Sequence, residues 1–455
     1  MSIESVNPLN GEVVRTYQPY PAELVTRKIR QSHQAFLSWK NTSFSDRAFC
    51  MTRMSDILRK RKHELAKLMA VEMGKPIKAG EGEIEKCALV CEYYAKNAEE
   101  FLARETVPSS AARSYITFNP LGVVLAIMPW NFPFWQTFRF LAPGLMAGNC
   151  CLLKHASNVP GCAIATEEII KEAGFPDRVF QTLLVESSAV EKIIENPVIK
   201  AVTLTGSTEA GMKVAQKAAS LIKKVVLELG GSDPYLVLKD ADVPLAAATC
   251  AESRLINSGQ SCIAAKRFIV VKEVAEEFIR LFKEEMQSKN MGNPLDEATA
   301  LGPMAKKELR DQLHAQVTRS IDQGAECILG GQISPGSHAF YPPTILINVK
   351  KGMPAYEEEM FGPVASVITV SDEEEAIQVA NDTSFGLGSA VFTTDIERGE
   401  EIAASRLNSG CSFVNDYVKS TPELPFGGVN QSGFGRELGT YGIKEFVNIK
   451  TVYIK

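Results

Sequence analysis

Short apolar runs alternate with helix-length segments from Gly122 onward, and this rhythm limits the folds open to the chain. The runs are residues 123–128, 150–153, 179–185, 201–204 and 225–227. Apolar runs of this length, each followed by enough chain for a helix, are typical of a parallel sheet whose crossover helices cover both faces. The sequence therefore predicts an α/β fold.

A second α/β region is predicted from Tyr235 onward, with a separate sheet. Its expected strands are residues 268–271, 340–346, 365–370, 389–392 and 411–414. The first hundred residues show helical spacing instead, as in Ile29, Phe36 and Trp39, and predict roughly two or three long amphipathic helices. Residues 114–118 and 447–455 alternate like edge strands, and we expect them to pair with another subunit because exposed strand edges usually find a partner.

The composition is that of a globular protein that acts on small molecules. With 455 residues, 45% of them hydrophobic and 23% charged, the chain can bury large cores. Its net charge of −5 is spread without a basic stripe, so we expect no nucleic-acid partner and no membrane partner. The N-terminus has no leader pattern, and no apolar stretch reaches about 18 residues, which predicts a cytoplasmic protein.

Cysteine and histidine spacing indicates neither a disulfide framework nor a metal centre. The ten cysteines stand at irregular intervals in a long chain, which favours reduced thiols. The five histidines are scattered, and none lies at ligand spacing from a cysteine pair. Cys87 and Cys91 share a helical face and are interpreted as buried side chains.

Cys262 is the strongest candidate nucleophile. It ends the run Asn257-Ser258-Gly259-Gln260-Ser261-Cys262, whose small residues leave room for a substrate to approach. A free thiol has a pKa of about 8.5, so a base or a positive field must raise its thiolate fraction. Glu228, which opens Glu228-Leu229-Gly230-Gly231, could be that base. Most intracellular cysteines are small buried hydrophobes, but these polar and glycine-rich neighbours favour a chemical role.

Three further polar groups follow predicted strands. Thr205-Gly206-Ser207 forms a glycine turn before a helix, where backbone N–H groups can approach phosphate, although a purely structural tight turn fits equally well. Lys154 ends another apolar run and could hold a ribose hydroxyl or a phosphate. Asn131, in the stiff loop Pro129-Trp130-Asn131-Phe132-Pro133, could donate to an oxyanion or bond its own backbone.

Taken in order, these segments resemble those of the NAD(P)-dependent aldehyde dehydrogenase superfamily over nearly the whole chain. The resemblance rests on the Asn131 loop, Lys154, Thr205-Gly206-Ser207, Glu228-Leu229-Gly230-Gly231, Gly259-Gln260-Ser261-Cys262, Glu359-Met360-Phe361-Gly362-Pro363 and Pro425-Phe426-Gly427-Gly428. It implies a Rossmann-like doubly wound cofactor domain of residues 1–106 and 122–230, a second α/β catalytic domain of residues 231–437, and a small β oligomerisation element of residues 107–121 and 438–455. It also implies a homodimer or homotetramer.

The resemblance assigns a role to each motif. Cys262 adds to the aldehyde carbonyl, and Asn131 holds the oxyanion together with the Cys262 backbone amide. Hydride leaves to the nicotinamide, and Glu228 activates the water that hydrolyses the thioester. Glu359 resembles the residue that binds the nicotinamide ribose. The implied cofactor-binding residues are Trp130, Lys154, Ser157, Gly206, Ser207, Leu229, Glu359 and Phe361.

Ser157 bears on the choice of cofactor. NAD-preferring relatives often carry a glutamate three residues after the lysine, where it holds the ribose 2′-hydroxyl and repels a 2′-phosphate. A serine hydroxyl can donate to that phosphate, and Lys154 supplies positive charge. We therefore expect NADP as the preferred cofactor, with NAD still able to bind.

Arg139 carries the expectation about the substrate. It shares a helical face with Trp135 and matches the position where succinate-semialdehyde dehydrogenases resemble one another in binding the substrate carboxylate with an arginine. Ser420 matches a serine near that carboxylate. Succinate semialdehyde is therefore the expected substrate. Ile256 replaces a second arginine of some members, so glutarate semialdehyde and other aliphatic aldehydes stay open.

Two other classes of protein fit the sequence less well. A cysteine hydrolase could use the same thiol and carboxylate without redox chemistry, but it leaves Lys154 and Glu359 unexplained. A structural protein built on an enzyme scaffold typically loses a catalytic side chain, whereas Cys262, Glu228 and Asn131 are all present. The sequence predicts an NADP-preferring aldehyde dehydrogenase.

Overall fold

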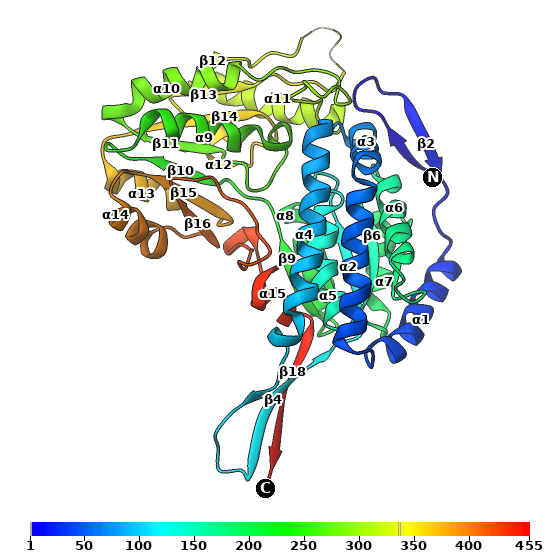
Figure 1. Ribbon diagram of the computed structural model, residues 1–455. Coiled ribbons are helices and arrows are strands. Elements are labelled where there is room, and N and C mark those ends of the chain that lie inside the picture. The colour runs from blue at the N-terminus through cyan, green and yellow to red at the C-terminus, as the bar shows by residue number, and fades with distance from the viewer. Residues whose placement is uncertain (1, 335, 337) are drawn as a thin grey trace.

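A six-stranded sheet forms the centre of one half of the computed structural model, which describes residues 2–334, 336 and 338–455 (Figure 1). The strand order is β17-β9-β8-β5-β6-β7, and every pairing is parallel except that of β17 with β9. The strands are β5 (Val123–Met128), β6 (Cys150–His155), β7 (Phe180–Thr182), β8 (Ile199–Thr205), β9 (Lys224–Glu228) and β17 (Gly433–Phe434).

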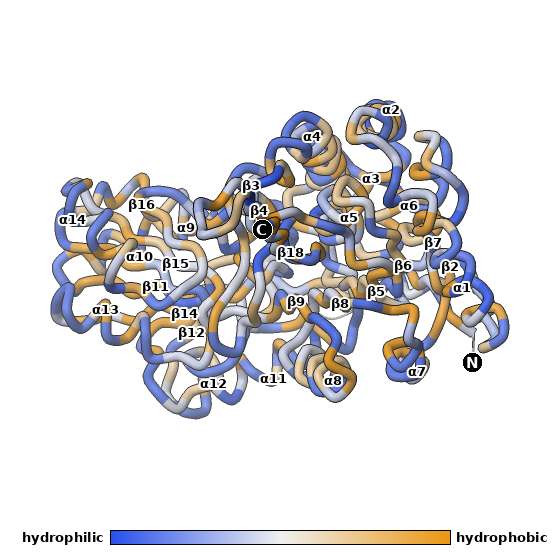
Figure 2. The backbone as a smooth tube through the Cα atoms, turned by 90° about the horizontal axis from the view of Figure 1, so that it is seen from below, coloured by the Kyte–Doolittle hydropathy of each residue, from blue (hydrophilic) through white to orange (hydrophobic). Residues whose placement is uncertain are grey.

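Helices cover both faces of this sheet. Figure 2 shows α5 and α6 on one side of it and α7 and α8 on the other. Strands buried on two faces must be apolar along their whole length, which is why they appear in the sequence as continuous rather than alternating runs. The predicted doubly wound α/β architecture is confirmed. The helices are α5 (Trp135–Met146), α6 (Pro160–Glu172), α7 (Val190–Glu195) and α8 (Thr208–Ala219).

The chain direction across this sheet creates a crevice. From β5 the chain moves outward through β6 to β7, and it then returns to place β8 and β9 on the other side of β5. Ligands in such sheets bind at the carboxyl ends of the strands, where the direction of winding reverses. Asn131, Lys154, Gly206 and Leu229 all lie at or just beyond these strand ends. The fold thus gathers four sequence-distant motifs at one edge.

The first hundred residues form four helices, where the periodicity predicted two or three. One residue, Arg61, separates the second helix from the third, so the apolar spacing hardly changes there. Gly74 ends the third helix in the left-handed conformation, with φ of 79°, and Pro76 precedes the fourth. A hairpin of β1 (Ile3–Val6) and β2 (Val13–Tyr17) comes before them. The helices are α1 (Ala22–Trp39), α2 (Phe44–Lys60), α3 (Lys62–Met73) and α4 (Ile77–Phe101).

A seven-stranded sheet occupies the other half of the molecule, with strand order β12-β13-β14-β11-β10-β15-β16. The predicted second sheet is confirmed. One strand begins later than predicted, at Thr344 rather than residue 340, because Pro342 and Pro343 cannot donate to a ladder. The strands are β10 (Pro234–Val237), β11 (Arg267–Val271), β12 (Glu326–Leu329), β13 (Thr344–Ile347), β14 (Val364–Val370), β15 (Gly388–Phe392) and β16 (Cys411–Val414).

Apolar clusters cover both faces of the second sheet. Along β10, Tyr235 and Val237 belong to one cluster, whereas Leu236 belongs to the other, as the two-residue period of a strand requires. The helices of this half are α9 (Val243–Leu255), α10 (Lys272–Gln287), α11 (Lys307–Asp322), α12 (Pro354–Glu357), α13 (Glu373–Asn381) and α14 (Ile396–Glu401). Short 3₁₀ segments span Ser187–Ala189, Ile256–Gly259 and Asn430–Ser432, and a π-helical turn spans Ile402–Arg406.

A third sheet projects from the body as a long ribbon with the C-terminus at its tip (Figure 1). Its order is β18-β4-β3, and β4 pairs with β18 over its full length, from Arg113 opposite Ile454 to Pro120 opposite Val447. The two predicted edge strands therefore pair with each other. The elements are β3 (Glu105–Thr106), β4 (Arg113–Pro120), β18 (Val447–Ile454) and the adjoining helix α15 (Gly439–Lys444). No helix among the described residues has the length and apolarity needed to cross a membrane.

Candidate active site

The loop that carries Cys262 has an unusual backbone. Directly after α9, three consecutive residues adopt positive φ: Asn257 at 53°, Ser258 at 55° and Gly259 at 74°. Asparagine and glycine accept this region readily, whereas a serine there costs about 1 kcal/mol or more. Two reasons require a glycine at position 259. Its φ is positive, and a Cβ there would collide with the Gly362 backbone.

Side chains from distant segments hold this loop in place. The Ser258 hydroxyl donates to the Gly302 carbonyl at 3.1 Å, and the Gln260 amide oxygen accepts from the Ala305 N–H at 2.9 Å. Arg254 is fully buried and donates to the Gly259 carbonyl at 2.6 Å. Arg254, to which the sequence assigned no role, thus supports the loop that carries Cys262.

Cys262 lies where two cavities meet. It is half-buried and lines a cavity of about 250 Å³ on the side of the first sheet and another of about 440 Å³ on the side of α4 and α5. Gln136 also lines both, a role that the sequence did not reveal. The first cavity holds Trp130, Asn131, Gly206, Ser207, Leu229, Cys262, Glu359 and Phe361 among the predicted residues, and the second holds Trp135, Arg139, Cys262 and Ser420.

Burial raises the pKa of the Cys262 thiol to about 12, although the nearby cations Lys266 and Arg139 act in the opposite direction. Desolvation disfavours the thiolate more than these two cations favour it. In this state the group is a protonated thiol. A nucleophilic role therefore requires that a base remove the proton when a substrate binds.

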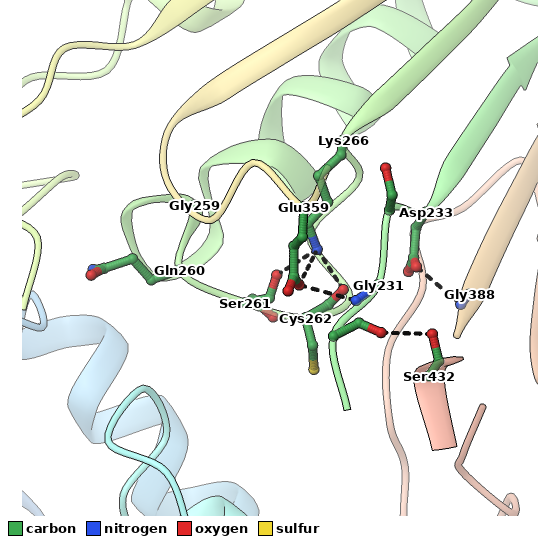
Figure 3. A network of polar contacts seen from close by, with 12 residues as sticks. Gly231, Asp233, Gly259, Gln260, Ser261, Cys262, Lys266, Glu359, Gly388 and Ser432 are labelled. Atoms are coloured by element: carbon green, nitrogen blue, oxygen red, sulfur yellow. Dashed lines mark hydrogen bonds and ion pairs between the residues drawn. The ribbon is translucent and has the colours of Figure 1, made fainter. Parts of the chain in front are cut away.

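A buried lysine connects the nucleophile loop to the opposite wall of the site. Lys266 donates to the carbonyls of Ser261 at 2.9 Å and of Cys262 at 2.5 Å, and it pairs with Glu359 at 3.5 Å. The same Glu359 oxygen accepts from the Gly231 N–H at 3.0 Å. Figure 3 shows this network, with the Cys262 sulfur pointing away from Lys266. Lys266 was not among the residues predicted from the sequence, where it is one of two adjacent cations, with Arg267, before the apolar residues of β11.

Asn131 is placed to donate a hydrogen bond near the nucleophile. Its side chain is only 4% exposed and donates to the Gln260 carbonyl at 3.1 Å, next to the Cys262 loop. Asn257 in turn donates to the Asn131 carbonyl at 2.8 Å, which fixes the backbone of the proline-flanked loop. An amide nitrogen carries two N–H groups, so one remains to donate to an oxyanion in the first cavity, which Asn131 and Cys262 both line.

Glu228 lies at the end of β9 with only 2% of its surface exposed. Burial raises the pKa of its carboxyl well above the usual range. Arg139 acts against this, and Glu437 adds to it. Neither carboxyl oxygen has a hydrogen-bond partner among the described residues, and a Cβ at Gly427 would lie 2.7 Å from Oε1. Glu228 is not among the described residues that line the two cavities at Cys262.

The cavity on the side of the first sheet has an aromatic entrance and a helix N-terminus. The Trp130 and Phe361 rings meet nearly edge-on, at 5.8 Å and 87°. Ser207 caps α8 by accepting from the Ala210 N–H at 3.3 Å, and a Cβ at Gly206 would make only an ordinary contact, 3.5 Å from a Leu204 methyl group. The first N–H groups of a helix favour anions. This combination suits a ligand with a flat ring at one end and phosphate at the other.

Lys154 and Ser157 lie farther along the same sheet edge. Lys154 is buried at the end of β6 and donates to the Ser187 hydroxyl at 3.4 Å; burial, then Lys306, lowers the pKa of its ammonium. Ser157 is exposed and lines a third cavity, of about 530 Å³, together with Lys306 and Lys307. Carboxylates line that cavity as well, namely Glu4, Glu186 and Glu308. The two residues therefore do not share a cavity with Cys262.

Arg139 lines the second cavity, but its charge is already engaged. It is 2% exposed, forms an ion pair with the buried Glu437, and donates weakly to the Thr205 hydroxyl at 3.4 Å. Its guanidinium also lies 4.8 Å from the centre of the Phe426 ring. The sequence could not show Glu437 as a partner, because the two residues are almost three hundred positions apart. Arg139 faces the cavity as a partly neutralised cation.

Ser420 receives two hydrogen bonds in the same cavity. The Trp135 indole N–H donates to its hydroxyl at 3.2 Å, and the Lys86 ammonium donates at 2.9 Å. Lys86 lies on α4, and no residue of that helix was predicted from the sequence to belong to the site. Trp135, Arg139 and Ser420 thus line one cavity, with Lys86 as an additional cation beside them.

Comparisons with known proteins point to one family. The family model described as "Aldehyde dehydrogenase family" matches residues 1–452. A probable succinate-semialdehyde dehydrogenase [NADP(+)] of Synechocystis sp. is 48% identical, with both chains fully covered. The structure of succinic semialdehyde dehydrogenase from Streptococcus pyogenes with NADP+ superimposes with a TM-score of 0.97 at 35% identity, covering 99% of each chain. An NAD-dependent aldehyde dehydrogenase from Sinorhizobium meliloti superimposes equally well, at 34% identity, covering 100% of this chain and 91% of that one. The chain belongs to the aldehyde dehydrogenase family.

Proposed function

We propose that the protein oxidises succinate semialdehyde to succinate with NADP, using Cys262 as the nucleophile. The observation that carries this proposal is the position of Cys262 between two cavities of different character. One cavity has the aromatic pair and helix N-terminus that suit a dinucleotide. The other ends in cationic and hydroxyl groups that suit a carboxylate. An aldehyde carbon placed at Cys262 is then within reach of both.

The residues on the first side fit a nicotinamide dinucleotide. The backbone N–H groups at Gly206 and the start of α8 suit the pyrophosphate, because a glycine lets a phosphate approach the backbone closely. Glu359 offers a carboxylate for ribose hydroxyls, held in place by Lys266 and the Gly231 N–H. Phe361 and Trp130 provide the flat apolar wall next to the nucleophile. When bound, the cofactor supplies the acceptor for the aldehyde hydride.

The chemistry then follows from the protein's own groups. The Cys262 sulfur adds to the aldehyde carbon, its proton passes to a base, and the carbonyl oxygen becomes an oxyanion. Asn131 and the Cys262 backbone N–H donate to that oxygen. Loss of hydride from the same carbon leaves a thioester on Cys262. Water attacks the thioester carbonyl, succinate leaves, and the sulfur takes back a proton.

Glu228 is the proposed base for the water step. In its buried position the pKa of the carboxyl is raised, which favours the protonated form, and that form cannot accept a proton. When the side chain turns from Gly427 toward Cys262, hydrogen bonds from the attacking water offset part of the desolvation of the carboxylate. Its pKa then falls, so the group becomes a base where the water must be activated.

A panel of aldehydes tests the substrate. With NADP, kcat/KM for succinate semialdehyde is expected to exceed that for butanal, an uncharged aldehyde of equal length, by at least about tenfold, because a charged hydrogen bond contributes roughly 1.5–3 kcal/mol. Initial rates of NADPH formation measure this. Equal efficiency for the two aldehydes would argue against carboxylate recognition, and ester cleavage without cofactor would instead favour a hydrolase.

Ser157→Glu is expected to change the cofactor preference. A carboxylate at this position repels the 2′-phosphate, so kcat/KM for NADP should fall by about 10- to 100-fold while that for NAD changes much less. Ser220→Glu, which adds the same charge at the far end of α8, is the matched control. Similar losses with both cofactors, or with the control, would contradict a specific role for Ser157.

A further inference from the structure

We infer that Lys86, together with the Ser420 hydroxyl, binds the carboxylate of the aldehyde substrate. This inference rests on the proposed function, since it assumes a substrate with a carboxylate. It adds a specificity-determining residue that lies on α4, far in sequence from the motifs of the site. Arg139 then contributes its charge from a position already paired with Glu437.

Lys86 faces the substrate side of Cys262. Its side chain lines the cavity of about 440 Å³, together with Trp135, Ser420 and Cys262. The ammonium lies 4.1 Å from the centre of the Trp135 ring and 2.9 Å from the Ser420 hydroxyl oxygen. These two contacts fix its position in the cavity, but neither brings a negative charge.

The hydrogen-bond inventory leaves donors for a carboxylate. An ammonium has three N–H groups, and Ser420 accepts one of those of Lys86. The Ser420 oxygen accepts from both Lys86 and the Trp135 indole, which uses its two lone pairs. The Ser420 O–H is therefore left to donate to a ligand in the cavity. An ammonium and a hydroxyl donor side by side match the two oxygens of a carboxylate.

No carboxylate forms an ion pair with Lys86 among the described residues. Glu83, one turn earlier on α4, is committed elsewhere, because one oxygen accepts from the Phe134 and Trp135 N–H groups at 2.9 Å each and the other pairs with the buried Lys75. The Glu437 carboxylate is taken by Arg139. Lys86 is thus a fixed cation beside the nucleophile without a counter-charge.

The surroundings also make this charge sensitive to pH. Burial, and then Arg139, lower the pKa of Lys86 to about 8, while Cys87, Glu83 and Cys262 act in the opposite direction. The ammonium is charged below this pKa and neutral above it. The ratio of kcat/KM for succinate semialdehyde to that for butanal should therefore fall as pH rises through about 8. Titration of Cys262 affects both aldehydes alike and cancels in the ratio.

Lys86→Met tests the inference in the full-length enzyme. We expect kcat/KM for succinate semialdehyde to fall by about 10- to 100-fold, chiefly through KM, and that for butanal to change by less than about threefold. Lys86→Arg should restore part of the loss. Lys96→Met is the matched control, because Lys96 lies on the same helix, α4, but is exposed and lines neither cavity at Cys262. It should stay close to the unchanged enzyme.

Each result has one reading. An equal loss of kcat/KM for both aldehydes would mean that Lys86 acts through packing. No loss for either aldehyde would mean that the carboxylate binds elsewhere. Either result overturns the inference. If Lys86→Met does not fold, the pH dependence of the aldehyde ratio in the unchanged enzyme decides, and a flat ratio overturns the inference. If the unchanged enzyme does not prefer succinate semialdehyde to butanal, the proposed function itself fails, whatever Lys86 does.

Discussion

Cys262→Ala is expected to abolish the reduction of NADP by aldehydes, lowering kcat/KM by roughly 10⁴-fold or more, because Cys262 is the one cysteine among the described residues that line the two cavities. The loss should be as complete for butanal as for succinate semialdehyde. NADPH formation at high enzyme concentration measures any residual rate. The cavity walls should persist, because removing one half-buried sulfur leaves the loop anchors at Gly302 and Ala305 intact.

Cys50→Ala is the matched control for this change. Cys50 is also partly exposed, but it lies on α2 and contacts Gly174, well away from both cavities. It should keep full activity. Reduction of NADP by the Cys262→Ala enzyme at a rate comparable to that of the control would rule out a covalent mechanism through Cys262.

Glu228→Gln should have the second largest effect, a loss of about 10²- to 10⁴-fold in steady-state kcat, since general-base catalysis contributes about this much. Hydride transfer precedes the water step, so the first turnover should survive better than later ones. Stopped-flow measurements should show a burst of NADPH close to one equivalent per active site. A slow phase should follow the burst.

A neighbouring carboxylate provides the control for Glu228. Glu358 precedes the ribose-side Glu359 in the chain but pairs on the surface with Arg319 at 3.0 Å, and Glu358→Gln should leave both phases unchanged. If Glu228→Gln slows the first turnover as much as the later ones, with no burst, Glu228 acts before hydride transfer. Its assignment to hydrolysis would then be wrong.

Residues at the ends of strands were the part of the site that sequence could predict. Asn131, Gly206 and Leu229 follow buried strands, and parallel strands bring their carboxyl ends to one edge whatever their separation along the chain. Cys262 and Glu359 come from the other half of the molecule, and only the family resemblance placed them opposite that edge. The structure places all five on one cavity.

Residues that act from helices or through buried partners could not be predicted in the same way. Lys86 is one charged residue among several on α4, and nothing in its neighbours shows that it faces Ser420. The pairing of Arg139 with Glu437 depends on how the last segment of the chain folds back onto α5. Periodicity specifies which side of a helix is buried, but not which distant charge lies against it.

Trapping the acyl group is the most direct test of covalent catalysis at Cys262. The Glu228→Gln enzyme should be mixed with succinate semialdehyde and NADP, quenched in acid, and analysed by intact and peptide mass spectrometry. We predict one succinyl group per chain, attached to the peptide that contains Cys262, in proportion to the NADPH of the burst. NADPH formed without any acyl group on Cys262, or with the group on another cysteine, would contradict the mechanism.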